Sequence, residues 1–347
     1  MSVLICDVIV LSWNRLDITK NFIESFWANT AVPSRLIIID NASSDGTVEY
    51  LSSLKDSSDR AIKVVFNKEN KGFVGGMNQG IAISDAPYVC LANNDLLFTK
   101  GWLEEIINMF QKYPQVGLLN PNSNNLGERF GEKETSLNDF ANDIRSRYKG
   151  VFIEMPFCIG FCMVIKRDVI NKIGVLSEDF YPAFFEDSDY SLRTVKAGYR
   201  IGVAKGSYVW HKEHATFDKL DKKKTEELFK RNKGIFIKKW GRMLRVAYVC
   251  HDIQQIDQHV QDIIDVARQG NYVAIFCKKE KVIDHGGVKC IAYKTMFDLI
   301  GRILIKKKRY DIVITNSVFL YNVFKLCGYC VLRNLDIGKI YEWKRKF

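Results

Sequence analysis

Short apolar runs alternate with helical patterns from the first residues of this 347-residue chain. Residues 8–11 (Val-Ile-Val-Leu) have the pattern of a buried strand, a helical pattern covers 17–29, and the next apolar run, 36–39, ends at Asp40. Strands that are each followed by a helix are typical of sheets whose strands run mainly parallel. The sequence therefore predicts an α/β fold.

The same alternation continues through the first two-thirds of the chain. It predicts strands at 63–66 and 88–91, a helix that begins near Gly76 and another helix from 102 to 113. The stretch 120–150 is polar and weakly patterned, so we expect a mobile loop region there.

A second, smaller series of strands and helices follows a basic helix at 222–240. Its expected elements are strands at 245–250, 272–277 and 310–315 and a helix at 257–269. A chain of 347 residues is longer than most single domains, so two domains are expected. We predict a first domain over 1–243 and a smaller Rossmann-like α/β domain over 244–347.

Hydropathy and charge indicate the cellular location and the kinds of partner to expect. No apolar run is long enough to span a bilayer and no signal peptide is visible, so we expect a cytoplasmic protein. The formal net charge is +11, and the excess lies late in the chain, in the runs 222–224, 238–239, 306–309 and 344–346. Solvated helix faces and a membrane surface explain these runs about equally well, whereas no nucleic-acid-binding module accompanies them.

The nine cysteines favour structural, reduced thiols. Cys6, Cys90 and Cys277 lie in or beside apolar strand-like runs, where a thiol behaves as a small apolar group. Cys327 and Cys330 have the spacing of a metal or redox pair, but no second pair lies nearby in the sequence to complete a zinc site.

Hydrogen-bonding residues gather immediately after three of the predicted strands. These groups are Ser12-Trp13-Asn14-Arg15, Asp40 to Thr47, and Asn93-Asn94-Asp95. Ligands of open α/β sheets bind beyond the carboxyl ends of the strands, so the three groups together predict a nucleotide pocket. Taken singly, each group is also an ordinary turn or helix cap.

A glycine-rich segment at 67–80 leads into a helix and contains Asn70, Gly72, Gly76 and Asn78. Glycines allow close approach of the backbone, and a helix N-terminus favours an anionic phosphate. The segment lacks both the Gly-Lys-Ser/Thr ending of a Walker loop and the Gly-x-Gly-x-x-Gly pattern of dinucleotide binding. Alone it is a weak signal.

Three carboxylates lie within four positions at Glu186, Asp187 and Asp189, preceded by aromatic residues. Such a cluster beside apolar bulk is costly unless its charges are paired, bound to metal or used in proton transfer. Helix capping explains one or two of these acids. Further along, His211 closes a strand and could meet Asp95 in space, since histidine and aspartate are good ligands for manganese- or magnesium-like ions.

Seven ordered segments resemble family 2 glycosyltransferases, most closely the rhamnosyltransferase-like branch, over roughly residues 3–243. They are 7–15, 37–47, 67–80, 93–95, 160–167, 184–193 and 210–216. The resemblance implies the GT-A fold, an inverting reaction and a nucleotide-sugar donor. It implies a divalent metal, Mn²⁺ or Mg²⁺, held by Asp95 and His211, and Asp187 as the general base. Thr216 matches the hydroxyl position that often follows the histidine.

The resemblance also assigns the donor-binding residues. Asp40 would contact a pyrimidine base, and the other donor-binding positions would be Ser12, Asn14, Arg15, Asn70, Gly72, Gly76, Asn78, Asn94 and Glu186. One departure concerns the metal, because Asn93 stands where the family's Asp-x-Asp element has its first acid. Related sequences in this branch also keep only the final Asp, so the departure weakens the expected metal affinity without excluding activity.

Residues 246–277 are similar to the N-terminal Rossmann half of GT-B glycosyltransferases. The usual Gly-Gly before the first helix is replaced by Gln254-Gln255, and the donor-binding second half is missing from this sequence. An independent second active site is therefore not expected. Acceptor binding, oligomerisation and a piece of a longer protein remain open for this domain.

Together these features predict an inverting hexosyltransferase of surface polysaccharide synthesis. The donor would be a UDP- or dTDP-sugar, and the acceptor a hydroxyl of a saccharide or lipid-linked saccharide, which suits a basic, peripheral-membrane face. A catalytically degenerate glycan- or partner-binding module is one alternative. A sugar-phosphate nucleotidyltransferase is another, but it would need a glycine- and arginine-rich signature where Ser12-Trp13-Asn14-Arg15 stands.

Overall fold

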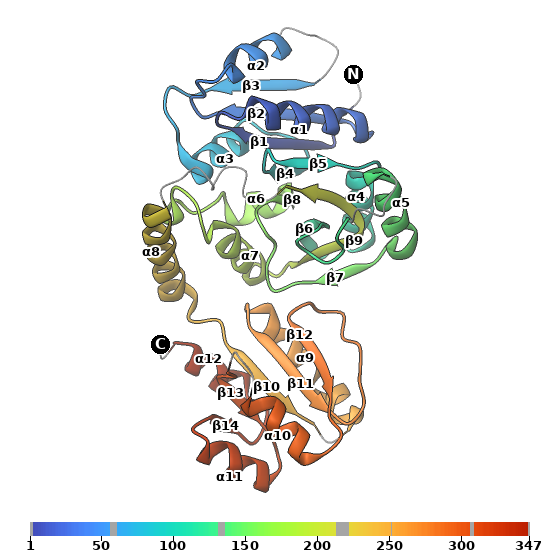
Figure 1. Cartoon of the computed structure of the whole chain (residues 1–347), viewed down its shortest axis with the longest axis vertical. Coiled ribbons are helices and arrows are strands. Elements are labelled where there is room, and N and C mark those ends of the chain that lie inside the picture. Colours follow the sequence, from blue (N-terminus) through green and yellow to red (C-terminus); the bar gives the residue numbers. More distant parts are fainter. Residues whose placement is uncertain are drawn as a thin grey trace. The chain divides into compact units, whose positions relative to one another are not determined.

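The computed structural model describes residues 3–55, 61–130, 136–212, 222–250, 252–305 and 309–345. The chain forms two compact units (Figure 1). The first unit contains Met1–Ile153 and Phe157–Ile235, and the second contains Glu154–Pro156 and Phe236–Phe347. The predicted boundary between 243 and 244 stays a prediction.

The first unit is built on a mixed sheet with the strand order β3-β2-β1-β4-β8-β6-β9-β5, and β7 pairs with β9 beside this path. The parallel half consists of β1 (Cys6–Ser12), β2 (Ser34–Asp40), β3 (Ile62–Phe66) and β4 (Tyr88–Ala92). The mixed half consists of β5 (Leu96–Phe98), β6 (Val116–Asn122), β7 (Phe152–Glu154), β8 (Cys162–Lys166) and β9 (Arg200–His211). In this half β8 runs antiparallel to both of its neighbours, β4 and β6, so the sheet is mixed from β4 onward.

Helices cover both faces of this sheet, which is why its central strands are apolar at nearly every position. Val8 and Val10 of β1 face a core that contains Trp102, whereas Ile9 faces a second core that contains Val74. The helices are α1 (Leu16–Asn29), α2 (Thr47–Lys55), α3 (Gly72–Ala82), α4 (Trp102–Lys112), α5 (Leu137–Tyr148), α6 (Arg167–Ile173), α7 (Glu186–Lys196) and α8 (Lys222–Trp240).

Helix α3 packs against β1 more closely than a helix with ordinary side chains could. A Cβ atom on Gly80 would lie 2.3 Å from Cγ2 of Ile9, and one on Gly76 would lie 2.5 Å from Cδ2 of Leu11. These glycines therefore serve helix–sheet packing, and the helix begins at Gly72, four residues before the predicted start.

The prediction of a loop region at 120–150 is wrong. Strand β6 extends to Asn122, and α5 occupies Leu137–Tyr148 with Ser136 as its N-cap. Most residues of α5 are charged or amide residues, so its short apolar side is hard to recognise in the sequence. On that side Phe140 and Ile144 are buried beside Tyr208 of β9. A helix with so few apolar residues gives little periodic signal in the sequence.

The second unit is built on an all-parallel sheet with the order β12-β11-β10-β13-β14. Its strands are β10 (Arg245–Val249), β11 (Tyr272–Cys277), β12 (Val288–Ala292), β13 (Ile312–Ile314) and β14 (Cys330–Leu332). Helices α9 (Ile253–Arg268) and α12 (Ile337–Arg345) contribute to one core, and α10 (Met296–Leu304) and α11 (Val318–Leu326) to the other. The predicted fold class, an α/β domain followed by a smaller Rossmann-like one, is confirmed.

Within the described residues, no helix combines the length and the apolar content that a bilayer span requires.

Candidate functional site

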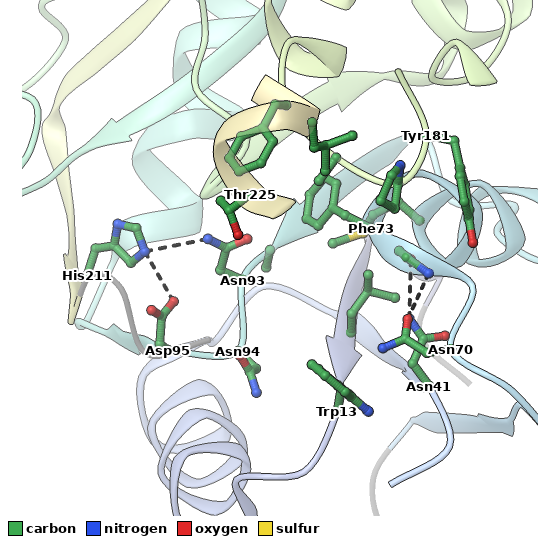
Figure 2. A pocket seen from close by; sticks show the side chains of 18 of the residues that line it. Trp13, Asn41, Asn70, Phe73, Asn93, Asn94, Asp95, Tyr181, His211 and Thr225 are labelled. Carbon is green, nitrogen blue, oxygen red and sulfur yellow. Dashed lines mark hydrogen bonds and ion pairs between the residues drawn. The ribbon is translucent and has the colours of Figure 1, made fainter. Parts of the chain in front are cut away.

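A cavity of about 810 Å³ lies beyond the carboxyl ends of β1 and β4, in the first unit (Figure 2). The order of the strands reverses between these two neighbours, which is where open α/β sheets bind their ligands. The lining comes from the ends of β1, β4 and β9, from the start of α3, from the loop at 181–184 and from Thr225 and Leu228 of α8. Several segments far apart in the sequence thus meet around one hollow.

Asp95 and His211 meet at one side of this cavity, as predicted. Asp95 Oδ1 lies 3.1 Å from His211 Nε2, and both residues are less than a tenth exposed. The two residues are neighbours because β5 pairs with the end of β9, with Leu96 opposite His211. The contact is close but forms no hydrogen bond, so Asp95 Oδ1 is a buried oxygen that no described residue satisfies.

This pair fits part of a divalent metal site. A carboxylate oxygen and an imidazole nitrogen are both common ligands of Mn²⁺, and neighbouring ligands of an octahedral ion with bonds of about 2.1 Å lie roughly 3.0 Å apart. Among the described residues, no third His, Cys, Asp or Glu joins them. An ion here would need its remaining ligands from a bound diphosphate, from water or from an amide such as Asn93, whose Nδ2 lies 3.5 Å from His211 Nε2.

Two asparagines hold His211 in place. Asn124 Nδ2 donates to the His211 carbonyl at 2.8 Å, and Asn124 Oδ1 accepts from the His211 backbone N–H at 2.9 Å. The Asn125 side-chain amide lies 2.9 Å from His211 Nδ1, and the ring of Phe161 stacks on the imidazole at 5.2 Å. Sequence reasoning missed both asparagines because they lie in the stretch predicted to be a loop. Adjacent amide residues directly after an apolar strand are the signal that was available.

The start of α3 forms the opposite side of the cavity. Asn70 Oδ1 accepts from the Gly72 N–H at 2.8 Å, and Asn41 Nδ2 donates to the Gly72 carbonyl at 3.2 Å. Gly72 has a φ of +64°, and a Cβ atom on it would lie 2.5 Å from Cβ of Pro182. The requirement for glycine here thus comes both from the backbone conformation and from the loop that passes over the helix.

Asp187 and Glu186 lie in a smaller adjoining cavity of about 340 Å³, which shares Asn93 and His211 with the large one. Asp187 Oδ2 accepts from the Gly160 N–H at 3.0 Å, and Oδ1 accepts from the backbone N–H and the hydroxyl of Ser188. Burial nevertheless raises the pKa of Asp187. Burial and then the charge of Asp187 raise the pKa of Glu186 to about 8. Glu186 is therefore poised to hold a proton near neutral pH, and the pKa of Asp187 is shifted in the same direction.

The predicted site residues divide into those that line the two cavities and those that do not. Asn70, Gly72, Asn94, Asp95 and His211 line the large cavity, and Glu186 and Asp187 line the small one. Ser12, Asn14, Arg15, Asp40, Gly76 and Asn78 line neither of them. Thr216 lies outside the described residues.

The residues outside the cavities shape the segments that form them. Asp40 is 1% exposed, and its carboxylate accepts from the N–H and the hydroxyl of Ser43. Asn78 exchanges two hydrogen bonds with the backbone of Leu176, at 3.0 Å each. Ser12 Oγ lies 3.1 Å from Thr19 Oγ1, and this contact is buried. Their predicted contacts with a donor stay predictions.

Asn14 and Arg15 form the tight link between β1 and α1. Both have positive φ values, and Asn14 Oδ1 accepts from the Ser44 N–H at 2.8 Å. Trp13 and Asn41 belong to the groups predicted to form a nucleotide pocket but were not singled out as donor-binding residues; both line the large cavity, as does Tyr181. An exposed tryptophan directly after a buried strand was the signal for the first of them.

Comparison with known proteins agrees with this geometry. Residues 7–174 match the family described as "Glycosyl transferase family 2". This part of the chain is therefore similar to glycosyltransferase family 2 domains. The match begins in β1 and ends just after α6, so it covers β1 to β4 and Asp95 but stops before Asp187 and His211.

Two curated relatives are similar at low identity. An uncharacterised protein of Sinorhizobium fredii, y4gI, is 23% identical over 249 residues, which are 67% of this chain and 27% of that protein. The O-antigen chain rhamnosyltransferase WbaN of Salmonella anatum is 26% identical over 208 residues, 57% of this chain and 62% of that protein. The chain thus spans less than two-thirds of the length of each of these relatives.

Among solved structures, GalNAc-T7 with UDP, GalNAc and Mn²⁺ has a TM-score of 0.50 and 14% identity, covering 60% of this chain and 44% of that chain. This likeness concerns the fold alone. The predicted likeness of residues 244–347 to half of a GT-B enzyme stays a prediction.

Proposed function

We propose that the first unit transfers a sugar from a pyrimidine nucleoside diphosphate to a hydroxyl group of a saccharide or lipid-linked saccharide, with inversion, in surface polysaccharide synthesis. The observation that carries this proposal is the meeting of Asp95, His211 and the α3 N-terminus around one cavity, with Asp187 in the adjoining cavity. The family 2 match over residues 7–174 and the similarity to an O-antigen rhamnosyltransferase support it.

In this proposal the donor occupies the large cavity. Its diphosphate lies between the α3 N-terminus, where the helix dipole favours an anion, and the Asp95–His211 pair. Trp13 offers an aromatic face to the base, while Asp40 holds the turn after β2 in place. A bound Mn²⁺ or Mg²⁺ would neutralise the charge that develops on the leaving diphosphate.

Asp187 supplies the proton transfer. Its carboxylate takes the proton of the acceptor hydroxyl as that oxygen forms a bond to the anomeric carbon and the bond from this carbon to the diphosphate oxygen breaks. The electron pair of the broken bond leaves with the nucleoside diphosphate. One displacement inverts the anomeric centre. The raised pKa of Asp187 suits this task, because it makes the carboxylate a stronger base than an ordinary aspartate.

Thermal denaturation with UDP, dTDP, GDP, CDP and NAD, each with and without Mn²⁺, tests the donor class first. A ligand that binds only the folded protein stabilises it by about 2.7 kcal/mol at a hundredfold excess over Kd. We expect UDP or dTDP to raise the melting temperature more with Mn²⁺ than without, and Asp95→Ala to remove the metal-dependent part. A response to NAD alone would overturn the proposal.

The variant Asp187→Asn distinguishes an enzyme from a catalytically degenerate binding module. That alternative is motivated by Asn93, which stands where the family's Asp-x-Asp element has its first acid. We expect this variant to keep its response to the nucleotide and to lose transfer from dTDP-rhamnose, UDP-glucose, UDP-galactose or a UDP-N-acetylhexosamine, whichever the native protein uses, by about a hundredfold or more. Unchanged biological function with Asp187→Asn would instead support the binding module. Release of pyrophosphate from a nucleoside triphosphate would identify a nucleotidyltransferase.

A further inference from the structure

Helices α10 and α11 lie next to each other on one face of the second unit's sheet. Their inner residues, Leu299 and Ile303 of α10 and Leu320 and Phe324 of α11, are fully buried in a shared core. Tyr329 joins the two helices, since its hydroxyl donates to the Ile303 carbonyl at 3.2 Å and its ring lies 5.9 Å from that of Phe324. Each helix is therefore anchored, and its outer side is fixed in direction.

The outer side of these helices and their ends carries several exposed large apolar side chains beside polar ones. Phe297 is 87% exposed, Ile305 84% and Leu326 89%, which is close to full exposure for large apolar side chains. The α10–α11 face, as we name it, consists of Phe297, Leu304, Ile305, Val318, Phe319 and Leu326. Single exposed apolar residues are common, but a group of six on two adjacent helices marks an interaction surface.

The positive charge of the chain lies in the same unit. Residues 236–347 contain 21 Lys and Arg against 10 Asp and Glu, whereas residues 1–235 contain 30 of each kind. The whole formal excess of +11 therefore falls in this part of the chain. Exposed cations lie close to this face along the chain: Lys294 precedes α10, Lys325 belongs to α11 and Arg309 precedes β13. Three more lysines, 306–308, follow Ile305 in the sequence and lie outside the described residues.

We propose that the α10–α11 face docks the second unit on an anionic lipid surface. Large apolar side chains that enter the boundary between headgroups and acyl chains, ringed by lysine and arginine, are the pattern of interfacial membrane binding. A second copy of the chain is a poorer occupant, because self-association through this face would bring two strongly positive units together. The proposal does not depend on the transferase activity of the first unit.

Sedimentation with vesicles tests this on the full chain. We compare phosphatidylcholine vesicles with vesicles that also contain phosphatidylglycerol, at low and high salt, for the native protein and for the double variant Phe297→Glu/Leu326→Glu. Val3→Glu is the matched control, because Val3 is 83% exposed in the first unit and the change in charge per site is the same. Both replaced side chains are exposed, so melting temperatures close to the native one confirm that the variants fold.

We expect the native protein and Val3→Glu to bind the anionic vesicles, and the double variant to bind roughly tenfold or more weakly. Retention of part of the binding at high salt is expected as well, because apolar insertion is not screened. Native-like binding by the double variant would overturn the proposal, as would a complete lack of binding by the native protein. A native dimer that the double variant loses, measured by light scattering, would assign the face to a second copy instead.

Discussion

At the scale of single residues, the candidate site depends on how buried polar groups are held. Side-chain amides contact both the backbone and the ring of His211. Asp187 accepts three hydrogen bonds, whereas one carboxylate oxygen of Glu186 has no donor among the described residues. Buried charged or polar groups cost free energy unless they are satisfied or used. The unsatisfied oxygens of Asp95 and Glu186 therefore mark the places where a ligand or a proton is expected.

Asn125 is expected to orient His211 for metal binding. Its side-chain amide faces His211 Nδ1 at 2.9 Å, and a histidine that binds metal through Nε2 needs a partner on Nδ1 to fix the tautomer of the ring. Asn125→Ala should weaken Mn²⁺ binding by about 10–100-fold with little change in the melting temperature of the metal-free protein.

Electron paramagnetic resonance of free Mn²⁺ in the presence of UDP or dTDP measures this effect directly. Asn142→Ala, at an exposed asparagine of α5, is the control and should bind as the native protein does. Equal Mn²⁺ affinity in Asn125→Ala and the native protein would contradict the orienting role.

Glu186 is expected to make the stability of the fold depend on pH. It is 7% exposed, and its folded pKa of about 8 lies above the ordinary value of 4.5. The folded protein therefore holds more protons than the unfolded chain between these values, and the free energy of unfolding falls as the pH rises through that window. Glu186→Gln should remove this fall. At the alkaline end, the unfolding free energy of the variant should therefore exceed that of the native protein by an amount on the order of 2–4 kcal/mol, relative to their difference at low pH.

Urea denaturation of both proteins at a series of pH values from about 5 to 9 measures the difference. The two curves of unfolding free energy against pH should diverge as the pH rises, in favour of the variant. Parallel curves would show that Glu186 titrates near its ordinary value.

At the scale of elements, α8 holds the loop that precedes α7, the helix on which the proposed base Asp187 lies. Asn232 is fully buried, and its Nδ2 donates to the carbonyls of Phe180 at 3.0 Å, Ala183 at 2.8 Å and Phe184 at 3.2 Å. Phe184 and Phe185 have positive φ values, which cost free energy in residues other than glycine. A helix that satisfies three carbonyls of this loop keeps the backbone before Glu186 and Asp187 in one conformation.

Asn232→Ala should therefore disturb catalysis as well as stability. Loss of the donor leaves up to three carbonyls without this partner, at a cost of about 1–3 kcal/mol in unfolding free energy. We expect kcat for sugar transfer to fall, because the loop leads into Asp187, and donor binding to weaken as well, because residues 181–184 also line the large cavity.

Lys233→Ala, at the exposed neighbouring position, is the control for helix content and charge. A melting temperature and kcat equal to the native values in Asn232→Ala would show that the loop keeps its conformation without α8. Melting curves and single-turnover kinetics are the two measurements.

At the scale of the whole molecule, the two units are not simply consecutive in the sequence. Residues Glu154–Pro156 group with the second unit, where the Glu154 carboxylate receives two hydrogen bonds from Arg268, at 2.5 and 3.1 Å. The formal charge is also divided unequally between residues 1–235 and 236–347, as described above. Because residues 154–156 group with the second unit, a simple cut near residue 243 would not isolate that unit intact.

Glu154→Ala should destabilise the second unit. The Glu154 side chain is 3% exposed and that of Arg268 is 24% exposed, so removal of the acid leaves a partly buried guanidinium with one partner fewer, at a cost of about 2–4 kcal/mol. Asp265→Ala removes the other, more exposed partner of Arg268 and should cost less than about 1 kcal/mol. Differential scanning calorimetry compares the two variants, and equal effects would contradict the ranking by burial.

The apolar runs of the sequence by themselves determined the fold class. Val8, Ile9 and Val10 are buried on alternating faces of one strand, so a strand with helices on both sides is the arrangement that removes all three from water. The residues at the carboxyl ends of β1, β2 and β4 were predictable for the same reason, because parallel strands bring those ends to one edge. Asn94 and Asp95 were found in this way, whereas Asn70 and Gly72 came from the glycine-rich segment before α3 and from the family resemblance.

Only the tertiary structure decided which polar residues reach the cavities and which support them. Asn125 meets His211 across 86 positions because β6 lies beside β9, and Asp187 meets Gly160 across 27 positions because α7 packs near the start of β8. The local sequence pattern does not predict such pairings, because they depend on the order of the strands in the sheet. For the same reason the sequence did not show that Asp40 and Asn78 bond to groups of their own fold; their predicted contacts with a donor stay predictions. The free energy of burial requires every polar group to find a partner, and packing determines which partner it finds.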